Sequence, residues 1–329
     1  MALLRSLRSP CSLCIRPIIA LHKTESVNNI ICRRSSSSSS SVENASSKSK
    51  QTNISTTPSY SYSIKESSDV ITLRNRVKII PLGQGIVHVR LSRPDKLNSL
   101  DLDMFDAIAE AAARLRDDVG LKKNLRVVIF SGEGKAFCTG LDAKSVALSG
   151  PGASLRRLLE RPSPFGGEGK GPKGNLAQDV CYLWRSLPVP VITVIHGMCY
   201  GGGLQIALGG DIRLSTFDCK ISIMESRWGL IPDMGISITL RELVRMDVAK
   251  ELTMTGRIIN GKEAERIGLV TRCVEDPMKE AMKVAMEIVE RSPDSVAATK
   301  ELFQSTWVAD EEICLNKETD LQRKLIGER

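Results

Sequence analysis

The chain has 329 residues, of which 42% are hydrophobic, 26% charged and only 4% aromatic. These proportions are those of a folded globular protein, and they exclude a wholly disordered chain, a collagen-like repeat and a coiled-coil rod. The formal net charge of +8 is concentrated in residues 1–68, which hold nine Lys/Arg and three Asp/Glu, whereas the remaining residues hold 37 and 35. Because the rest of the chain is nearly neutral and has few aromatic side chains, we expect no nucleic-acid partner.

Residues 1–68 have the composition of a targeting signal rather than of a folded domain. Arg5 and Arg8 come early, no acidic residue precedes Glu25, and 20 of the 68 residues are serine, including an unbroken run from 35 to 41. An Arg-rich, Ser-rich and acid-poor segment is typical of an organelle transit peptide. We expect a mitochondrial transit peptide followed by a disordered linker. A plastid or peroxisomal address and a merely disordered tail are the alternatives.

Neither metal binding nor a membrane span is expected from the rest of the chain. Its six cysteines include no C-x-x-C pair, so zinc and a disulfide framework are not indicated. The longest uncharged stretch, residues 186–210, is interrupted by two prolines and six glycines. This stretch is better explained as a buried strand, a tight turn and a helix than as a membrane span.

The predicted elements begin at Asp69, where strands and helices start to alternate. We expect a hairpin (77–80 and 85–91), a helix (100–115) that begins at Asn98 or Ser99, and strands at 127–131 and 189–195. A helix opening at 204–208 and strands at 212–216 and 220–223 follow. From Ile236 onward the chain is predicted to be mostly helical, over 238–244, 249–254, 262–267, 278–290 and 295–307. This order predicts an α/β core with a C-terminal helical region.

Residues 149–175 contain four prolines and seven glycines. This composition predicts a long mobile loop, and loops of such length are uncommon unless they are functional. The segment is interpreted either as a lid or as an insertion without a role.

Three segments have the residue types of a catalytic site. In residues 195–205 a predicted strand leads through three consecutive glycines (201–203) into a helix, so unpaired N–H groups at the helix start can bind a phosphate or an oxyanion. Residues 135–142 follow another strand through two glycines. In the third segment Glu225 and Asp233 stand eight residues apart among apolar residues, where burial raises the pKa of a carboxyl toward neutrality. The other interpretation of both acids is that they cap turns or pair with Arg227.

Together these segments resemble the crotonase superfamily, the enoyl-CoA hydratases and isomerases. The resemblance begins with residues 93–100, RPDKLNSL, similar to the family's R-P-x-x-x-N-x-L. It continues through A-F-x-x-G-x-D at 136–142, the glycine turn and the segment 224–235, and it ends with T-G-R at 255–257 and A-E-x-x-G-L-V at 264–270. The implied fold is α/β, a spiral of ββα repeats over residues 69–270. The resemblance also implies that residues 271–329 form a helical region through which the chain assembles into a homotrimer or homohexamer.

The resemblance also implies a substrate and the residues that bind it. The thioester oxygen of an acyl-CoA is expected between the backbone N–H groups of Leu141 and Gly202. Because the CoA belongs to the substrate, no separate cofactor is expected. The other residues expected to bind the substrate or its CoA are Arg93, Lys96, Ala136, Gly140, Asp142 and Gly201.

The acidic residues distinguish the reactions of the family. Hydratases carry a glutamate where this chain has Gln205, and a glutamine cannot accept a proton from water near neutral pH. Dienoyl-CoA isomerases have acids that match Glu225 and Asp233, although they usually have an aspartate at the position of Gln205. We therefore expect an isomerase of fatty-acid β-oxidation that converts 3,5-dienoyl-CoA to 2,4-dienoyl-CoA, with Gln205 as an orienting group. An enoyl-CoA hydratase and a catalytically weak acyl-CoA-binding protein are the alternatives.

Overall fold

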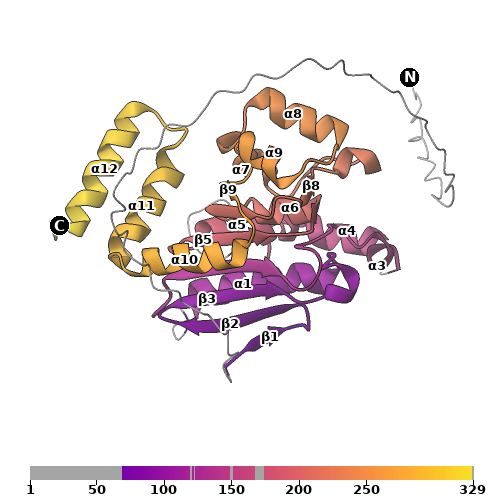
Figure 1. The fold of residues 1–329 in the computed structure, drawn as a ribbon, viewed down its shortest axis with the longest axis horizontal. Coiled ribbons are helices and arrows are strands. Elements are labelled where there is room, and N and C mark those ends of the chain that lie inside the picture. Colours follow the sequence, from indigo (N-terminus) through magenta and orange to yellow (C-terminus); the bar gives the residue numbers. More distant parts are fainter. Residues whose placement is uncertain (1–68, 119–120, 122, 149–150, 167–173, 328–329) are drawn as a thin grey trace, which may run out of the picture. The chain divides into compact units, whose positions relative to one another are not determined.

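The computed structural model describes residues 69–118, 121, 123–148, 151–166 and 174–327. The predicted transit peptide and linker, residues 1–68, lie outside the described residues. The described chain is an α/β protein, as predicted, with the elements drawn in Figure 1.

The main sheet has the strand order β1-β2-β3-β4-β5-β7-β9. Strands β1, β2 and β3 pair antiparallel, whereas β3, β4, β5, β7 and β9 run parallel. All residues of β4 and β5 are buried, as expected for predominantly apolar strands that are covered on both faces. The bounds are β1 (Ile71–Leu73), β2 (Val77–Gly83), β3 (Ile86–Leu91), β4 (Val127–Gly132), β5 (Val191–Ile195), β7 (Ile212–Ser215) and β9 (Arg272–Cys273).

Helices cover the two faces of this sheet and create two hydrophobic clusters. On one face α1 (Leu102–Asp117) and α5 (Leu176–Ser186) pack together over side chains such as Val89 and Phe130. On the other face α10 (Pro277–Val289) contacts β4, β5 and β7 and buries Ile129 and Val194. Alternate residues of each strand therefore enter opposite clusters, which is the period-two pattern of a pleated strand.

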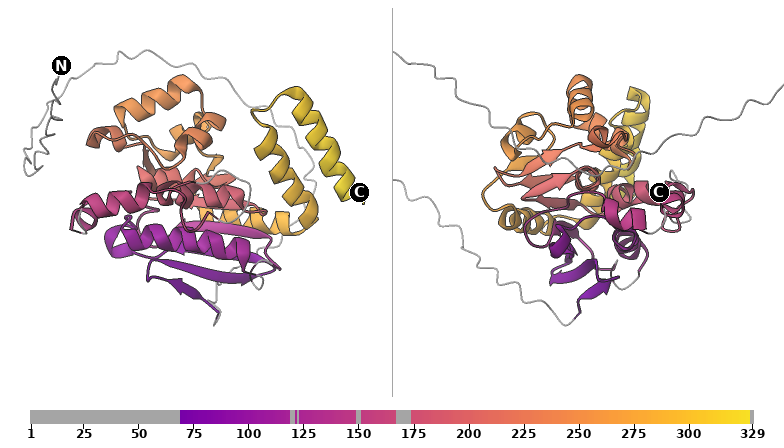
Figure 2. Two further views of the ribbon diagram at one scale, coloured as in Figure 1. Left: turned by 180° about the vertical axis from the view of Figure 1, so that it is seen from behind. Right: turned by 90° about the vertical axis from the view of Figure 1, so that its right-hand side faces the viewer.

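The remaining elements are a second small sheet, a C-terminal pair of helices and several short helices. Strands β6 (Met198–Tyr200) and β8 (Lys220–Ser222) form a small parallel sheet. Helix α11 (Pro293–Thr306) and helix α12 (Glu311–Leu325) run side by side as a hairpin, coloured yellow in Figures 1 and 2. The short helices are η1 (Pro94–Lys96), α3 (Ala143–Leu148), α4 (Pro151–Leu159), α6 (Gly202–Ala207), η2 (Glu225–Trp228), α7 (Ile236–Thr239), η3 (Leu240–Glu242), α8 (Met246–Thr255) and α9 (Gly261–Arg266).

The predicted start of α1 is wrong. The N-cap is Asp101, whose carboxylate accepts a hydrogen bond from the backbone N–H of Met104 at 2.9 Å. Asn98 cannot cap this helix because its side chain is bonded elsewhere and its backbone is left-handed, with φ of 55°.

The prediction of a loop throughout residues 149–175 is also wrong, because residues 151–159 form α4. Proline is well suited to the first position of a helix, where its missing N–H has no intrahelical partner in any case. Helix α4 then buries Leu158 and pairs Arg157 with the buried carboxylate of Asp106 on α1. Residues 167–173, the most glycine-rich part of the predicted loop, lie outside the described residues.

Candidate active site

Three segments of the candidate site follow neighbouring strands at one edge of the main sheet, whereas the segment with Glu225 and Asp233 follows β8 of the small sheet. Strands β3, β4 and β5 are parallel neighbours, and Leu91 at the end of β3 is paired with Gly132 at the end of β4. The next residues of each strand are 92–101, 133–142 and 196–203. Ligand sites of parallel α/β sheets form at this carboxyl edge, so the topology brings together segments that are far apart in sequence.

Asn98 ties the first two of these segments to each other. Its Oδ1 accepts a hydrogen bond from the backbone N–H of Arg93 at 2.9 Å, and its Nδ2 donates to the carbonyls of Glu133 and Ala136, both at 2.9 Å. The side chain is completely buried. Although the spacing of R-P-x-x-x-N included this residue, its positioning role was missed because it depends on carbonyls at least 35 residues away.

The second segment lies between the first and the third. The N–H of Leu100 donates to the carbonyl of Gly140 at 2.8 Å, and the N–H of Tyr200 donates to the carbonyl of Cys138 at 3.0 Å. Glycines allow this close approach: a Cβ on Gly140 would lie 2.8 Å from the Tyr200 carbonyl, and one on Gly203 would lie 2.4 Å from the Cys138 carbonyl.

This packing brings the predicted oxyanion-binding amides of Leu141 and Gly202 into adjacent segments. A Cβ added to Gly140 would lie 3.5 Å from the backbone nitrogen of Gly202. Because Gly202 is the first residue of α6, its N–H has no acceptor within the helix. Among the described backbone hydrogen bonds, neither the Leu141 nor the Gly202 N–H donates to a carbonyl. Two such donors at neighbouring positions can stabilise a carbonyl oxygen that becomes negative.

Gln205 holds Glu225 in place beside these amides. Its Nε2 donates to Oε1 of Glu225 at 2.6 Å, and its own Oε1 accepts from the backbone N–H of Met234 at 2.9 Å. The other carboxylate oxygen of Glu225, Oε2, is buried and has no hydrogen-bond partner in the described part of the chain. The carboxylate faces Gly201, whose Cβ position is 3.4 Å from Oε1. Glu225 therefore has one fixed oxygen and one free oxygen.

Both acids have a raised pKa, mainly because of burial. Desolvation raises the pKa of Glu225, the negative charge of Asp233 raises it further, and the hydrogen bond from Gln205 lowers it in part. Partial burial of the carboxyl also raises the pKa of Asp233, although this residue as a whole is exposed. The electrostatic effect of Asp233 on Glu225 means that the two carboxylates share one region of the site.

The residues expected to bind CoA are only partly available for that role. Arg93 donates to the carboxylate of Asp142 at 2.9 Å and pairs with Asp101 at 3.4 Å. Asp142 also accepts two hydrogen bonds from Ser145 at the start of α3, and although burial opposes it, these bonds and Arg93 lower its pKa. Lys96 is exposed on η1. Arg93 and Asp142 thus hold the loops together through their ion pair, and Lys96 is the cation that is more available to bind CoA.

The described residues contain no group of three or more His, Cys, Asp or Glu side chains that could hold a metal ion. None of the described helices is long and apolar enough to cross a membrane.

Comparison with known proteins is consistent with this geometry. The family model for enoyl-CoA hydratase/isomerase matches residues 86–328. The chain belongs to the enoyl-CoA hydratase/isomerase family. It is 31% identical over 224 residues to the carnitinyl-CoA dehydratase of Salmonella typhi, a match that covers 67% of this chain and 77% of that protein.

Solved structures show the same fold. An enoyl-CoA hydratase from Bacillus anthracis superposes with a TM-score of 0.66 at 25% identity, covering 77% of this chain and 91% of that protein. One from Thermoplasma volcanium gives 0.65 at 26% identity, covering 77% and 93%. A Thermobifida fusca protein solved in complex with acetoacetyl-CoA gives 0.65 at 22% identity, covering 78% and 96%. The crotonase fold predicted from the motifs is therefore confirmed.

Proposed function

We propose that this family member is an acyl-CoA double-bond isomerase that converts 3,5-dienoyl-CoA to 2,4-dienoyl-CoA. The observation that carries the proposal is the side chain of Gln205, which is fixed at both ends by Glu225 and Met234. Both polar atoms of this amide are engaged with the protein, and an amide cannot take a proton from water near neutral pH. The site therefore favours proton transfer by Glu225 on carbon over activation of water by two carboxylates.

The first step is removal of a proton from C2, the carbon next to the thioester. Oε2 of Glu225 is the free oxygen, and it lies beside Gly201, one residue before the amide of Gly202. As the C–H electrons move into the conjugated system, negative charge develops on the thioester oxygen. The Leu141 and Gly202 amides would donate to that oxygen, and loss of one such donor in other enzymes costs roughly 3–4 kcal/mol of barrier.

The second step is delivery of a proton to C6, the far end of the conjugated system. Asp233 is the other acid of the site, and its raised pKa leaves it protonated more often than an ordinary aspartate. Transfer from Asp233 to C6 completes the shift of both double bonds and leaves Asp233 ionised and Glu225 protonated. Proton exchange with solvent then restores the starting state, and the exposure of Asp233 allows this exchange.

A dehydratase or hydratase is the second candidate, and a specific observation favours it. The relatives at 31% identity are named carnitinyl-CoA dehydratase. Elimination of water from a 3-hydroxyacyl thioester also begins with proton removal at C2, so the same amides and Glu225 would serve. It further needs an acid near C3 to protonate the leaving hydroxyl.

The purified chain can be assayed with 3,5-dienoyl-CoA, 3-enoyl-CoA and 2-enoyl-CoA, with product analysis for each. The isomerase proposal expects 3,5-dienoyl-CoA to turn over fastest, and it expects both Glu225→Gln and Asp233→Asn to abolish that turnover. Glu275→Gln, which changes an exposed carboxylate after β9, serves as the control. Faster conversion of 2-enoyl-CoA to the 3-hydroxy product would instead show a hydratase, and loss only in Glu225→Gln would show a one-base isomerase. An acyl-CoA-binding protein would turn over none of them.

We further propose mitochondrial targeting by residues 1–68 and assembly into a homotrimer or homohexamer. The first rests on the composition of that segment. The second is supported by exposed apolar side chains on η2, in the segment after it and on the neighbouring α8. Trp228, Ile231, Met246 and Met254 are 65%, 77%, 72% and 72% exposed. Apolar patches of this kind mark interaction surfaces.

A further inference from the structure

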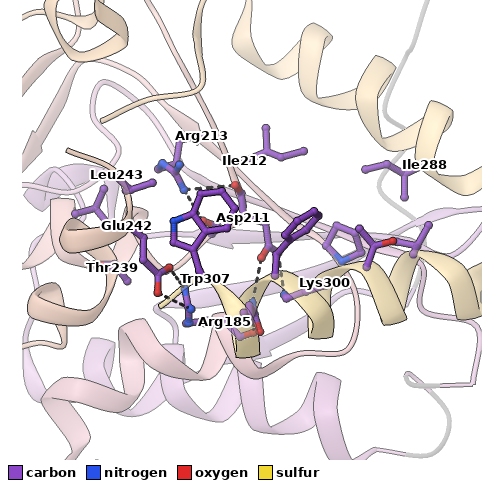
Figure 3. Close-up of a pocket in the computed structure, with 18 residues that line it drawn as sticks. Arg185, Asp211, Ile212, Arg213, Thr239, Glu242, Leu243, Ile288, Lys300 and Trp307 are labelled. Atoms are coloured by element: carbon purple, nitrogen blue, oxygen red, sulfur yellow. Dashed lines mark hydrogen bonds and ion pairs between the residues drawn. The ribbon is translucent and has the colours of Figure 1, made fainter. Parts of the chain in front are cut away.

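A cavity lies at the opposite end of α6 from Gly202. It has a volume of about 450 Å³, opens to the surface and is lined by residues of α5, β7, η3 and α11. Figure 3 shows the side chains around it. Much of its wall is apolar, and Phe303 and Trp307 stack edge to face at its rim with ring centroids 5.9 Å apart. None of the proposed catalytic residues lines this cavity.

Four charged side chains of the cavity wall neutralise each other in pairs. Arg185 makes a two-pronged ion pair with Glu242, with N–O distances of 2.7 and 2.9 Å. The Lys300 ammonium contacts Asp211 at 2.8 Å, and Asp211 also accepts from the backbone N–H of Val191 at 2.7 Å. These pairs satisfy the rule that buried charges need partners, and Figure 3 shows them as dashed contacts.

Arg213 is the fifth charged residue of the wall, and it has no such partner. Its side chain is buried, with the residue only 6% exposed. Nε donates to the carbonyl of Leu269 at 3.0 Å and Nη1 donates to the carbonyl of Gly210 at 2.7 Å. Within the described residues it forms no ion pair, and Nη2 makes no hydrogen bond. Burial lowers the pKa of Arg213 to about 10, although the negative charges of Asp211 and Glu242 raise it in part, so the guanidinium remains charged at neutral pH.

The cavity therefore has one excess positive charge, a free Nη2 group on Arg213 with two N–H donors, and an apolar wall. A buried cation without a counterion is costly, and a carboxylate would complete it by accepting from Nη2. A second negative charge on the ligand would be repelled by Asp211 and Glu242. We propose that this cavity, the Arg213 cavity, binds a monocarboxylate with a hydrocarbon body, which would pack against Phe303 and Trp307. The cavity volume lies in the range of small-molecule sites.

Octanoate is a suitable probe, with octan-1-ol as its uncharged counterpart, and calorimetry of the full chain measures both. We expect one saturable octanoate site per chain, and binding of octanol that is roughly tenfold to a hundredfold weaker, the usual effect of losing a charge-assisted hydrogen bond. Arg213→Gln should weaken octanoate binding by the same factor. Arg241→Gln, an exposed arginine on η3, should leave it unchanged.

The titration is repeated with octanoyl-CoA in excess, which fills the catalytic site if the proposed function holds. Octanoate binding that persists under this condition supports a separate site, whereas displacement by octanoyl-CoA overturns the proposal. Should Arg213→Gln fail to fold, Val296→Trp fills the cavity from α11 without changing Arg213, and it should abolish octanoate binding. Three results would each refute the monocarboxylate site. They are the absence of saturable octanoate binding, octanoate binding that is retained in Val296→Trp, and octanoate binding only at protein concentrations so low that copies of the chain dissociate from each other.

Discussion

The role of Gln205 can be tested by replacing it with leucine, which has a similar volume and no polar atoms. The substitution removes the 2.6 Å hydrogen bond to Glu225 and the 2.9 Å hydrogen bond from Met234. The bond from Gln205 stabilises the ionised form of Glu225 and so lowers its pKa against the larger effect of burial. Without this bond the pKa of Glu225 must rise further above its ordinary value.

The size of the change follows from the strength of the lost bond. A hydrogen bond to a charged group contributes about 1.5–3 kcal/mol, and each pKa unit corresponds to about 1.36 kcal/mol. The free-energy cost of ionising Glu225 should therefore rise by about 1.5–3 kcal/mol in Gln205→Leu, and its pKa should rise accordingly. Since the proposed base acts when ionised, activity is lost as the pH falls through this pKa. The acidic limb of the pH–rate profile should move to higher pH by as much as this pKa rises.

The assay is kcat/KM for 3,5-dienoyl-CoA as a function of pH, because this profile reports the groups of the free enzyme. Gln178→Leu is the matched control. Oε1 of Gln178 accepts hydrogen bonds from the backbone N–H of Asn175 and from Nη2 of Arg161, but the residue lies on α5 and does not contact Glu225. The control should leave the acidic limb in place.

An acidic limb that stays where it is in Gln205→Leu, with activity reduced equally at every pH, would refute this reasoning. It would mean that Gln205 supports the fold or orients substrate rather than tuning Glu225. Thermal unfolding of the variant distinguishes those two explanations, because only the first lowers Tm.

Three other predictions concern packing and assembly. Gly203→Ala should lower the free energy of unfolding, measured in urea, by about 1–3 kcal/mol, because the new Cβ would lie 2.4 Å from a backbone carbonyl oxygen. The control Gly152→Ala should not lower it, because a Cβ there has no atom within 4 Å. Asn98→Ala breaks three hydrogen bonds of 2.9 Å and should cost about 1–3 kcal/mol in the same assay. Ile231→Asp, which puts a charge on a 77% exposed apolar side chain, should shift sedimentation of the proposed oligomer toward the monomer without unfolding it.

The elements that were predicted well are those whose sequence pattern is set by burial on both faces. Strands β4 and β5 are continuous apolar runs, and the structure buries every one of their residues. The hairpin of β2 and β3 and the helix α10 have equally clear patterns. Helix ends were predicted less well, because the choice between Asn98 and Asp101 as the cap depends on which side chain a distant loop engages.

Short elements were missed for a related reason. Strand β9 has only two residues and exists because Thr271 and Val274 donate to the carbonyls of Arg213 and Ser215 on β7. Helix α4 has proline and glycine among its first residues, and it is anchored by Arg157 to Asp106 on α1. No local pattern encodes contacts of this kind.

The candidate site was predictable as a set of segments but not as a network. Three glycine-rich or acidic segments could be recognised because each has a distinctive local composition. That Gln205 donates to Glu225, 20 residues later, and accepts from the backbone of Met234, 29 residues later, follows only from the folded geometry. Whether these residues perform the proposed chemistry stays a prediction for the assays above.

Unpartnered charged groups show most clearly what this protein is built to hold. Asp106 and Asp179 also have a buried oxygen without a hydrogen bond, but Arg74 and Arg157 neutralise Asp106, and Ser163 and Arg116 stabilise the charge of Asp179. Glu225 has only a neutral donor, and Arg213 has only neutral acceptors. A buried charge without an ion-pair partner costs stability. We therefore interpret both groups as binding sites, in which a ligand supplies the missing interaction. The two side chains would bind opposite partners: Glu225 would take a proton from an acidic C–H group, and Arg213 would bind an anion.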